Sequence, residues 1–138
     1  MAIDENRSAS KGTSIVGNNT SSALYVHPLN SLGMMMVPTQ FDGAGYRSWR
    51  REVMRALSVK NKLGFIDGSC VKPSTNSPQI RQWQRCDDMV ASWILNSLTK
   101  DISDSVKYLT DSVELWKELE DRYRSNKWTK AISNTERN

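Results

Sequence analysis

The stretch of residues 79–98, QIRQWQRCDDMVASWILNSL, decides the fold that this sequence predicts. At about 100° per residue, its apolar side chains cover roughly half the circumference of a helix, and its charged and amide side chains cover the rest. Two of the apolar side chains are Trp83 and Trp93. A covered tryptophan buries roughly 150 to 250 Å², so we expect the other helices to pack around this one.

The length of the chain, 138 residues, is enough for one domain with a core of its own. No run of 18 apolar residues occurs that would span a membrane, and the opening MAIDENRSAS lacks the features of a signal peptide. Cys70 and Cys86 are too few and too unevenly spaced for a disulfide framework or a zinc site. We therefore expect an intracellular protein, cytoplasmic rather than nuclear, that has no membrane partner and no metal.

The two ends of the chain differ in composition from its middle. Residues 1–22 are rich in Ser, Asn, Gly and Thr and have little to bury, which predicts a disordered arm. Residues 125–138 show no sustained periodicity, which predicts a frayed tail. The predicted domain comprises residues 23–124.

Short apolar runs cut by proline and glycine follow the arm. They predict extended segments or a hairpin within residues 24–40, and a second short extended piece is expected at residues 63–69. Three consecutive methionines, Met34, Met35 and Met36, can form an adaptable contact surface, because methionine fills irregular gaps. Ordinary packing in the core or at its edge is the favoured alternative for these methionines.

Three further helices are predicted. Residues 46–62 place their aromatic and aliphatic side chains on one face, and residues 101–109 form a short helical turn. Asp111 precedes Glu114 by three residues, as in a capping box, and opens a helix. The fold class is therefore mainly α, a small bundle of about four to five helices. The predicted core residues are Tyr46, Trp49, Leu57, Trp83, Val90, Trp93, Ile94, Leu98, Trp116, Leu119 and Tyr123.

The outer face of the helix at residues 46–62 is predicted to be basic. Arg47, Arg51, Arg55 and Lys62 lie opposite the apolar face, and the excess positive charge of the chain is concentrated in residues 41–72. One interpretation is contact with the phosphate backbone of a nucleic acid. The favoured alternative is a solvated surface, because no aromatic side chain lies between the arginines to stack on bases.

No arrangement of residues in the sequence indicates catalysis. His27 is the only histidine and has no neighbouring nucleophile motif. Asp87 and Asp88 are adjacent on a helix, so their side chains point about 100° apart and cannot share a proton. Asp87 falls on the apolar arc, where burial would demand a hydrogen-bonding partner. We expect a protein that is not an enzyme, with no cofactor and no small-molecule substrate.

Several blocks of sequence occur in an order that resembles a known family. They are Phe41-x-Gly43-x-x-Tyr46-x-x-Trp49, residues 57–69 (LSVKNKLGFIDGS), residues 83–98 (WQRCDDMVASWILNSL) and Leu115-Trp116-x-x-Leu119-x-x-Arg122-Tyr123. Together they resemble the N-terminal gag region of plant copia-type LTR retrotransposons, and the likeness spans about residues 24–123. Gly45, where the family usually has Asn, and the sequence after Tyr123 depart from the family pattern.

The resemblance implies a helical fold like the N-terminal lobe of a retrotransposon capsid protein. It also implies a structural role through self-association, with copies of itself or other gag-like proteins as partners, in a capsid-like particle that packages element RNA. Because the second lobe and the downstream enzymes of the family's polyprotein do not follow, it implies a truncated product. Two alternatives are an RNA-binding module that uses the basic helix and a host-adopted interaction domain that uses Met34, Met35 and Met36.

Overall fold

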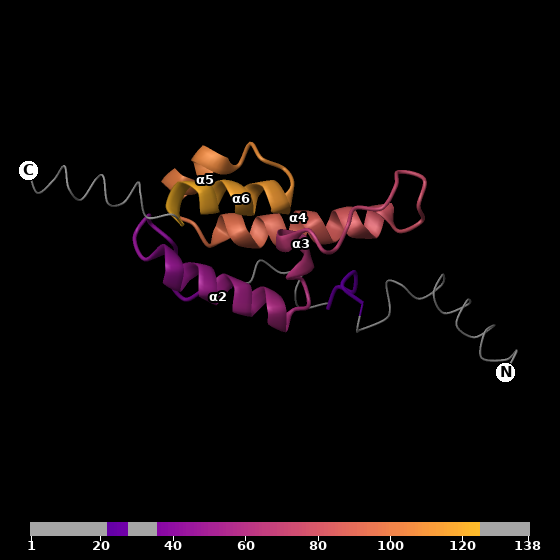
Figure 1. The fold of residues 1–138 in the computed structure, drawn as a ribbon, viewed down its shortest axis with the longest axis horizontal. Helices are drawn as coiled ribbons and strands as arrows, with labels where there is room; N and C mark the ends of the chain where they lie inside the picture. Colours follow the sequence, from indigo (N-terminus) through magenta and orange to yellow (C-terminus); the bar gives the residue numbers. More distant parts are fainter. Residues whose placement is uncertain (1–21, 28–35, 125–138) are drawn as a thin grey trace, which may run out of the picture.

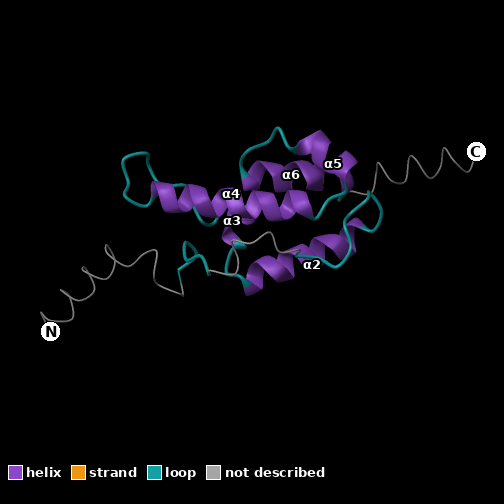
Figure 2. Cartoon of the chain, turned by 180° about the vertical axis from the view of Figure 1, so that it is seen from behind, coloured by secondary structure: helices purple, strands orange, loops and turns teal. Residues whose placement is uncertain are grey.

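The computed structural model describes residues 22–27 and 36–124, and this part of the chain is mainly helical (Figure 1). Its helices are α2 (Tyr46–Val59), α3 (Gly64–Asp67), α4 (Ile80–Asn96), α5 (Lys100–Val106) and α6 (Ser112–Tyr123). Loops join them, and no strand occurs within the described residues (Figure 2). The prediction of a small helical bundle is confirmed. The predicted arm and tail lie outside the described residues, apart from Ser22.

Helix α4 occupies the middle of the bundle, with α2 on one side and α5 and α6 on the other (Figure 1). Its buried face includes Trp83, Val90, Trp93 and Ile94, the side chains that the helical periodicity placed on one arc. Since these side chains lie along the full length of α4, neighbouring helices can pack against both of its ends. The longest helix is therefore also the one that organises the core.

The chain leaves α4 through a short extended contact. The helix ends at Asn96, and Leu98 pairs with Phe41 in an isolated parallel bridge. The Phe41 amide donates to the Ser97 carbonyl at 2.8 Å, and the Thr99 amide donates to the Phe41 carbonyl at 3.0 Å. These hydrogen bonds hold the segment before α2 against the end of α4 and fix where α2 begins.

Helix α2 is shorter than the sequence predicts. Gly45 precedes it with a φ of 72°, a left-handed conformation that glycine adopts without steric cost. The helix ends at Val59, and Asn61 turns the chain with a φ of 57°, which asparagine tolerates better than most residues. The reversal at Asn61 takes Lys62 off the helix and toward the core.

Residues 64–67 form the short helix α3 instead of the predicted extended piece. Phe65 and Ile66 are both buried, and Gly68 closes the turn with a φ of 83°. Four residues are too few for helical periodicity to appear in the sequence. Residues 24–27 and 36–40, the described parts of the other predicted extended segment, form no strand, and the rest of that segment lies outside the described residues.

Helices α5 and α6 close the other side of the bundle. Asp111 is the N-cap residue of α6, as the sequence predicts, but its side chain makes no capping hydrogen bond. The Asp87 carboxylate of α4 instead accepts a long hydrogen bond from the Ser112 amide at 3.4 Å, and the Ser112 hydroxyl donates to the Asp87 carbonyl at 2.9 Å. The buried aspartate therefore joins α4 to the start of α6.

An aromatic cluster of Phe41, Tyr46, Trp49, Trp116 and Tyr123 joins α2 to α6. The rings of Trp49 and Trp116 stack with their centroids 5.6 Å apart, and those of Phe41 and Trp49 at 5.1 Å. Each such pair contributes about 0.5 to 1.5 kcal/mol beyond its buried area. The Trp49 indole also donates to the Ser97 carbonyl at 3.2 Å, which links α2 to the end of α4.

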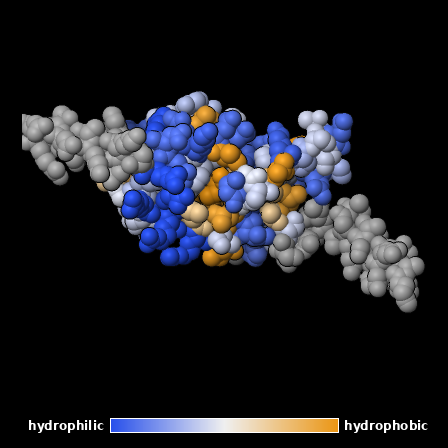
Figure 3. All heavy atoms as spheres, viewed as in Figure 1, coloured by the Kyte–Doolittle hydropathy of each residue, from blue (hydrophilic) through white to orange (hydrophobic). Residues whose placement is uncertain are grey.

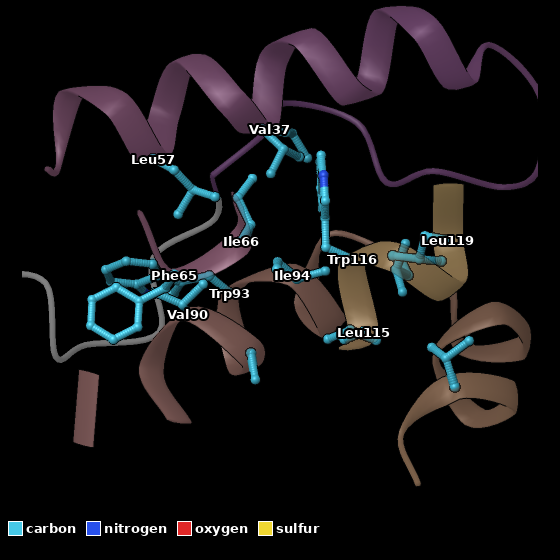
Figure 4. Packing of buried hydrophobic residues seen from close by; sticks show 14 of the residues in the cluster. Val37, Leu57, Phe65, Ile66, Val90, Trp93, Ile94, Leu115, Trp116 and Leu119 are labelled. Atoms are coloured by element: carbon cyan, nitrogen blue, oxygen red, sulfur yellow. The ribbon is translucent and has the colours of Figure 1, made fainter. Parts of the chain in front are cut away.

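The other buried side chains continue this core between the helices. Figure 4 shows Leu57 of α2, Ile66 of α3, Trp93 of α4 and Leu119 of α6 in one packed cluster. Each residue that the sequence predicted for the core is buried except Tyr123, which is partly buried against it. The core thus faces inward from every helix and leaves the opposite face of α2 exposed.

Candidate nucleic-acid interface

An arginine-rich groove of about 620 Å³ runs along the outer face of α2 and reaches the end of α6. Hydrophilic side chains gather over this part of the molecule (Figure 3). Within the described residues, five arginines and no acidic residue line the groove, together with a tyrosine, a methionine, a serine and a valine. The lining residues, which we call the arginine groove, are Tyr46, Arg47, Arg50, Arg51, Met54, Arg55, Ser58, Val59 and Arg124.

The regular spacing of α2 creates most of this positive charge. Arg47, Arg51 and Arg55 are exposed and follow one another every four residues, so about 6 Å of helix separates each from the next. None of the three forms an ion pair with another described residue. Because their charge is not neutralised by the protein, they can bind an anion from outside.

Helix α6 completes the groove from the other side. The Arg50 Nε lies 2.7 Å from a Glu120 carboxylate oxygen, and an Arg124 guanidinium nitrogen lies 3.9 Å from the other oxygen. The Glu120 side chain is mostly buried, so this carboxylate orients Arg50 from behind without lining the groove. The arginines of two helices are thereby held over one surface.

The Tyr46 hydroxyl is a neutral donor at this site. Tyr46 is 6% exposed, and its hydroxyl has no hydrogen-bond partner among the described residues. Burial raises the pKa of Tyr46, and the nearby Glu120 carboxylate raises it further. The phenol therefore keeps its proton near neutral pH. A buried hydroxyl without a partner is uncommon, and this one lies close to the Arg50 side chain at the wall of the groove.

The prediction that Lys62 belongs to the exposed basic stripe is wrong. Its residue surface is only 1% exposed, and its ammonium donates to the Tyr25 carbonyl at 2.6 Å. Burial lowers the pKa of Lys62. The sequence reasoning extended α2 to residue 62, whereas the left-handed turn at Asn61 directs the lysine inward. Lys62 therefore does not reach the arginine groove.

Sequence reasoning also missed two of the five arginines that line the groove. Arg50 lies next to the apolar face of α2 by helical periodicity, and Arg124 is far away in the sequence. Only the packing of α6 against α2 brings them together. Of the methionines proposed as a contact surface, Met36 is partly buried against the core, and Met34 and Met35 lie outside the described residues.

The described residues contain few groups suited to other chemistry. No three His, Cys, Asp or Glu side chains in residues 22–27 and 36–124 converge as a metal site requires. Cys70 and Cys86 are free thiols, and burial raises the pKa of both, which disfavours the reactive thiolate. No described helix is long and apolar enough to cross a membrane.

The comparison with known families agrees with the resemblance seen in the sequence. Residues 27–74 match the model of a family described as the gag-polypeptide of LTR copia-type. The match supports a copia-type gag region in this part of the chain. The gag match includes α2 and α3 and ends before α4, and it supports a structural role of the kind that gag proteins have. No curated protein and no solved structure matches the chain.

Proposed function

We propose that this gag-derived structural domain, which is not an enzyme, binds RNA by contacting its phosphates in the arginine groove. The observation that carries the proposal is the convergence of five arginines, four of α2 and the C-cap residue of α6, on one groove that no described acidic residue lines. The proposal assigns this activity to a folded unit of residues 23–124 in the cytoplasm. RNA is the expected nucleic acid because gag proteins belong to elements that replicate through RNA.

The geometry favours phosphates over bases as the groups that the groove contacts. Arg47, Arg51 and Arg55 present a row about 12 Å long, and a guanidinium can donate two parallel hydrogen bonds to one phosphate. Tyr46 is the one aromatic residue in the described lining, and because it is buried the lining offers no exposed ring that would stack on bases. Binding through phosphates alone has little dependence on sequence and weakens steeply with salt.

The salt dependence of RNA binding tests this proposal. Four phosphate contacts, made by Arg47, Arg51, Arg55 and Arg124, predict a slope of roughly −2.8 in a plot of log K against log salt. Affinity for a fluorescent single-stranded RNA should therefore fall roughly 50-fold between about 50 and about 200 mM salt. Fluorescence anisotropy at several salt concentrations measures this slope.

A triple variant and a matched control localise the binding site. Arg47→Gln with Arg51→Gln and Arg55→Gln should reduce the slope to roughly −0.7. A control with Arg81→Gln and Arg85→Gln removes exposed arginines of α4, outside the groove, and should retain most of the affinity and nearly the full slope. A flat salt response of the unmodified chain, or equal losses in both variants, would contradict the proposal.

A second proposed function is self-association, as the gag resemblance implies. Tyr108 and Val113, which flank the turn between α5 and α6, are 67% and 40% exposed. Exposed apolar side chains close together in the sequence favour a protein partner, and a further copy of this chain or another gag-like protein is the partner that we propose. Such a surface is compatible with a capsid-like particle.

Light scattering coupled to size-exclusion chromatography tests self-association across a range of protein concentrations. We expect the mass of the unmodified chain to rise with concentration, and Tyr108→Ser with Val113→Ser to reduce that rise. The control Val71→Ser changes a side chain that is 75% exposed but belongs to the loop between α3 and α4. A strictly monomeric chain at the highest concentration would contradict the proposal.

A further inference from the structure

Residues 22–27, which we call the strap, lie against α4 and the turn that follows α2 (Figure 1). Side chains from the body of the protein donate to two adjacent carbonyls of the strap. Lys62 Nζ donates to the Tyr25 carbonyl at 2.6 Å, and Gln82 Nε2 donates to the Leu24 carbonyl at 2.7 Å. The Cys86 thiol makes a weaker contact with the same Leu24 carbonyl at 3.4 Å. We call Lys62, Gln82 and Cys86 the clamp.

One side chain anchors the strap in the core. Leu24 is 7% exposed and belongs to the main hydrophobic cluster, and Ala23 and Val26 pack partly against that cluster. Grooves that bind short peptides commonly use the same two features. Hydrogen bonds to the peptide backbone give affinity, and a pocket for a side chain such as this leucine gives selectivity. None of these contacts depends on the strap belonging to the same chain as the clamp.

The buried charge of Lys62 makes an empty clamp unfavourable. No described carboxylate pairs with this ammonium, and the carbonyls of Tyr25 and Lys60 are its hydrogen-bond acceptors. Burying an ammonium costs free energy unless hydrogen bonds compensate, so removal of the strap would leave Lys62 without its shortest contact. The folded protein is therefore more stable when a peptide that offers the same carbonyls and an apolar anchor occupies the clamp.

We propose that the clamp also accepts the strap of a second copy of this chain, so that copies associate by exchanging residues 22–27. The structure itself shows that this segment fits the clamp. Eight residues, 28–35, join the strap to the next described segment, and an extended chain of that length reaches at most about 27 Å. Exchange replaces each contact with an identical one, so protein concentration decides between the closed monomer and the exchanged dimer. This inference rests on the proposed self-association.

Two full-length variants with complementary defects test the exchange. Leu24→Asp puts a carboxylate where the anchor is buried, which disables the strap and leaves the clamp intact. Lys62→Met with Gln82→Met removes the main donors, which disables the clamp and leaves the strap intact. With Tyr108→Ser and Val113→Ser also present in both chains to remove the other proposed contact, the two variants mixed in equal amounts should form a one-to-one complex by light scattering, whereas each alone should remain monomeric.

A control and a second measurement keep the test independent of folding defects. Lys117→Met with Gln84→Met makes the same chemical change away from the clamp, and this chain should associate as the unmodified chain does. A synthetic peptide of residues 20–29 should lower the fraction of associated unmodified chain, and the same peptide with Leu24→Asp should not. This measurement needs no variant of the protein.

The outcomes separate this inference from self-association itself. If each variant alone associates as strongly as the unmodified chain and the peptide has no effect, copies associate through another surface and strap exchange is wrong. If the unmodified chain is monomeric at every concentration and the mixed variants form no complex, both proposals are wrong. If the mixed variants form a complex and the peptide lowers the fraction of associated unmodified chain, strap exchange is supported.

Discussion

Replacement of Trp49 by phenylalanine tests whether the aromatic cluster holds α2 in place. Trp49 is 4% exposed, donates to the Ser97 carbonyl and stacks on Trp116. The Ser97 carbonyl also accepts from the Phe41 amide, so it keeps one partner when the indole is removed. The lost hydrogen bond therefore costs about 1 kcal/mol, near the middle of the usual range, and not the full penalty of an unsatisfied buried group.

The smaller ring adds a second loss to the hydrogen bond. Phenylalanine leaves roughly two methylene-sized groups of the indole unreplaced, at about 0.8 kcal/mol each. Together with the hydrogen bond, we expect Trp49→Phe to lower the free energy of unfolding by about 2 to 3 kcal/mol. For a domain of this size the melting temperature should then fall by about 10 to 20 °C.

Urea unfolding followed by far-ultraviolet circular dichroism measures the effect of Trp49→Phe without relying on tryptophan fluorescence. Val59→Ala is the control, because Val59 is 82% exposed on the same helix and a surface change there should cost less than about 0.5 kcal/mol. A loss for Trp49→Phe as small as that of the control would refute the reasoning. It would mean that α2 does not depend on the contacts of Trp49 with α4 and α6.

Three other substitutions have expected outcomes that follow from single contacts. Burial raises the pKa of Asp87, so just above the usual aspartate pKa the folded protein binds more protons than the unfolded chain. The free energy of unfolding therefore falls as pH rises through that window. Thermal unfolding across pH should show that Asp87→Asn removes this dependence and raises the melting temperature at neutral pH. Gly68→Ala should cost about 1 to 2 kcal/mol in urea unfolding, because φ is 83° and only the backbone strain, not a clash, opposes the methyl group. Glu120→Gln frees Arg50 from its ion pair and should increase RNA affinity in the anisotropy assay, so an unchanged or weaker affinity would count against the groove.

The sequence was sufficient to predict the long helices and their inward faces. In α2, α4 and α6, tryptophans and aliphatic side chains recur at helical spacing, and burial of those faces is the main source of helix stability in a folded domain. Asp111 was also recognised as the residue before α6. The predicted capping hydrogen bond of Asp111 does not form, and the carboxylate that bonds the first turn of α6 is that of Asp87, a residue of another helix.

Short elements and turns were predicted less well, for a physical reason. Helix α3 is a single turn, so its two adjacent buried residues, Phe65 and Ile66, are equally compatible with a short extended run. The direction of Lys62 depends on one backbone angle, the positive φ of Asn61. Nothing in the spacing of charged residues distinguishes a helix that continues to residue 62 from one that turns inward before it.

The arginine groove depends both on a local sequence pattern and on the packing of helices that are distant in the sequence. The row of Arg47, Arg51 and Arg55 is a local pattern and was visible in the sequence, whereas Arg124 joins it only because α6 packs against α2. The same packing explains why the row is exposed. Stacking of Trp49 on Trp116 turns the apolar face of α2 inward, and at helical spacing the arginines must then face outward.

The clamp, like the arginine groove, includes residues outside the part of the chain that matches the gag family. Lys62 lies within the matched residues 27–74, but Gln82 and Cys86 belong to α4, and the strap carbonyls that they bind precede the match. The strap and the groove therefore both need helices that lie outside the matched region. A fragment limited to residues 27–74 would contain the exposed arginine row and neither α4 nor α6, and it would leave Trp49, Leu57 and Lys62 without the partners that make their burial favourable.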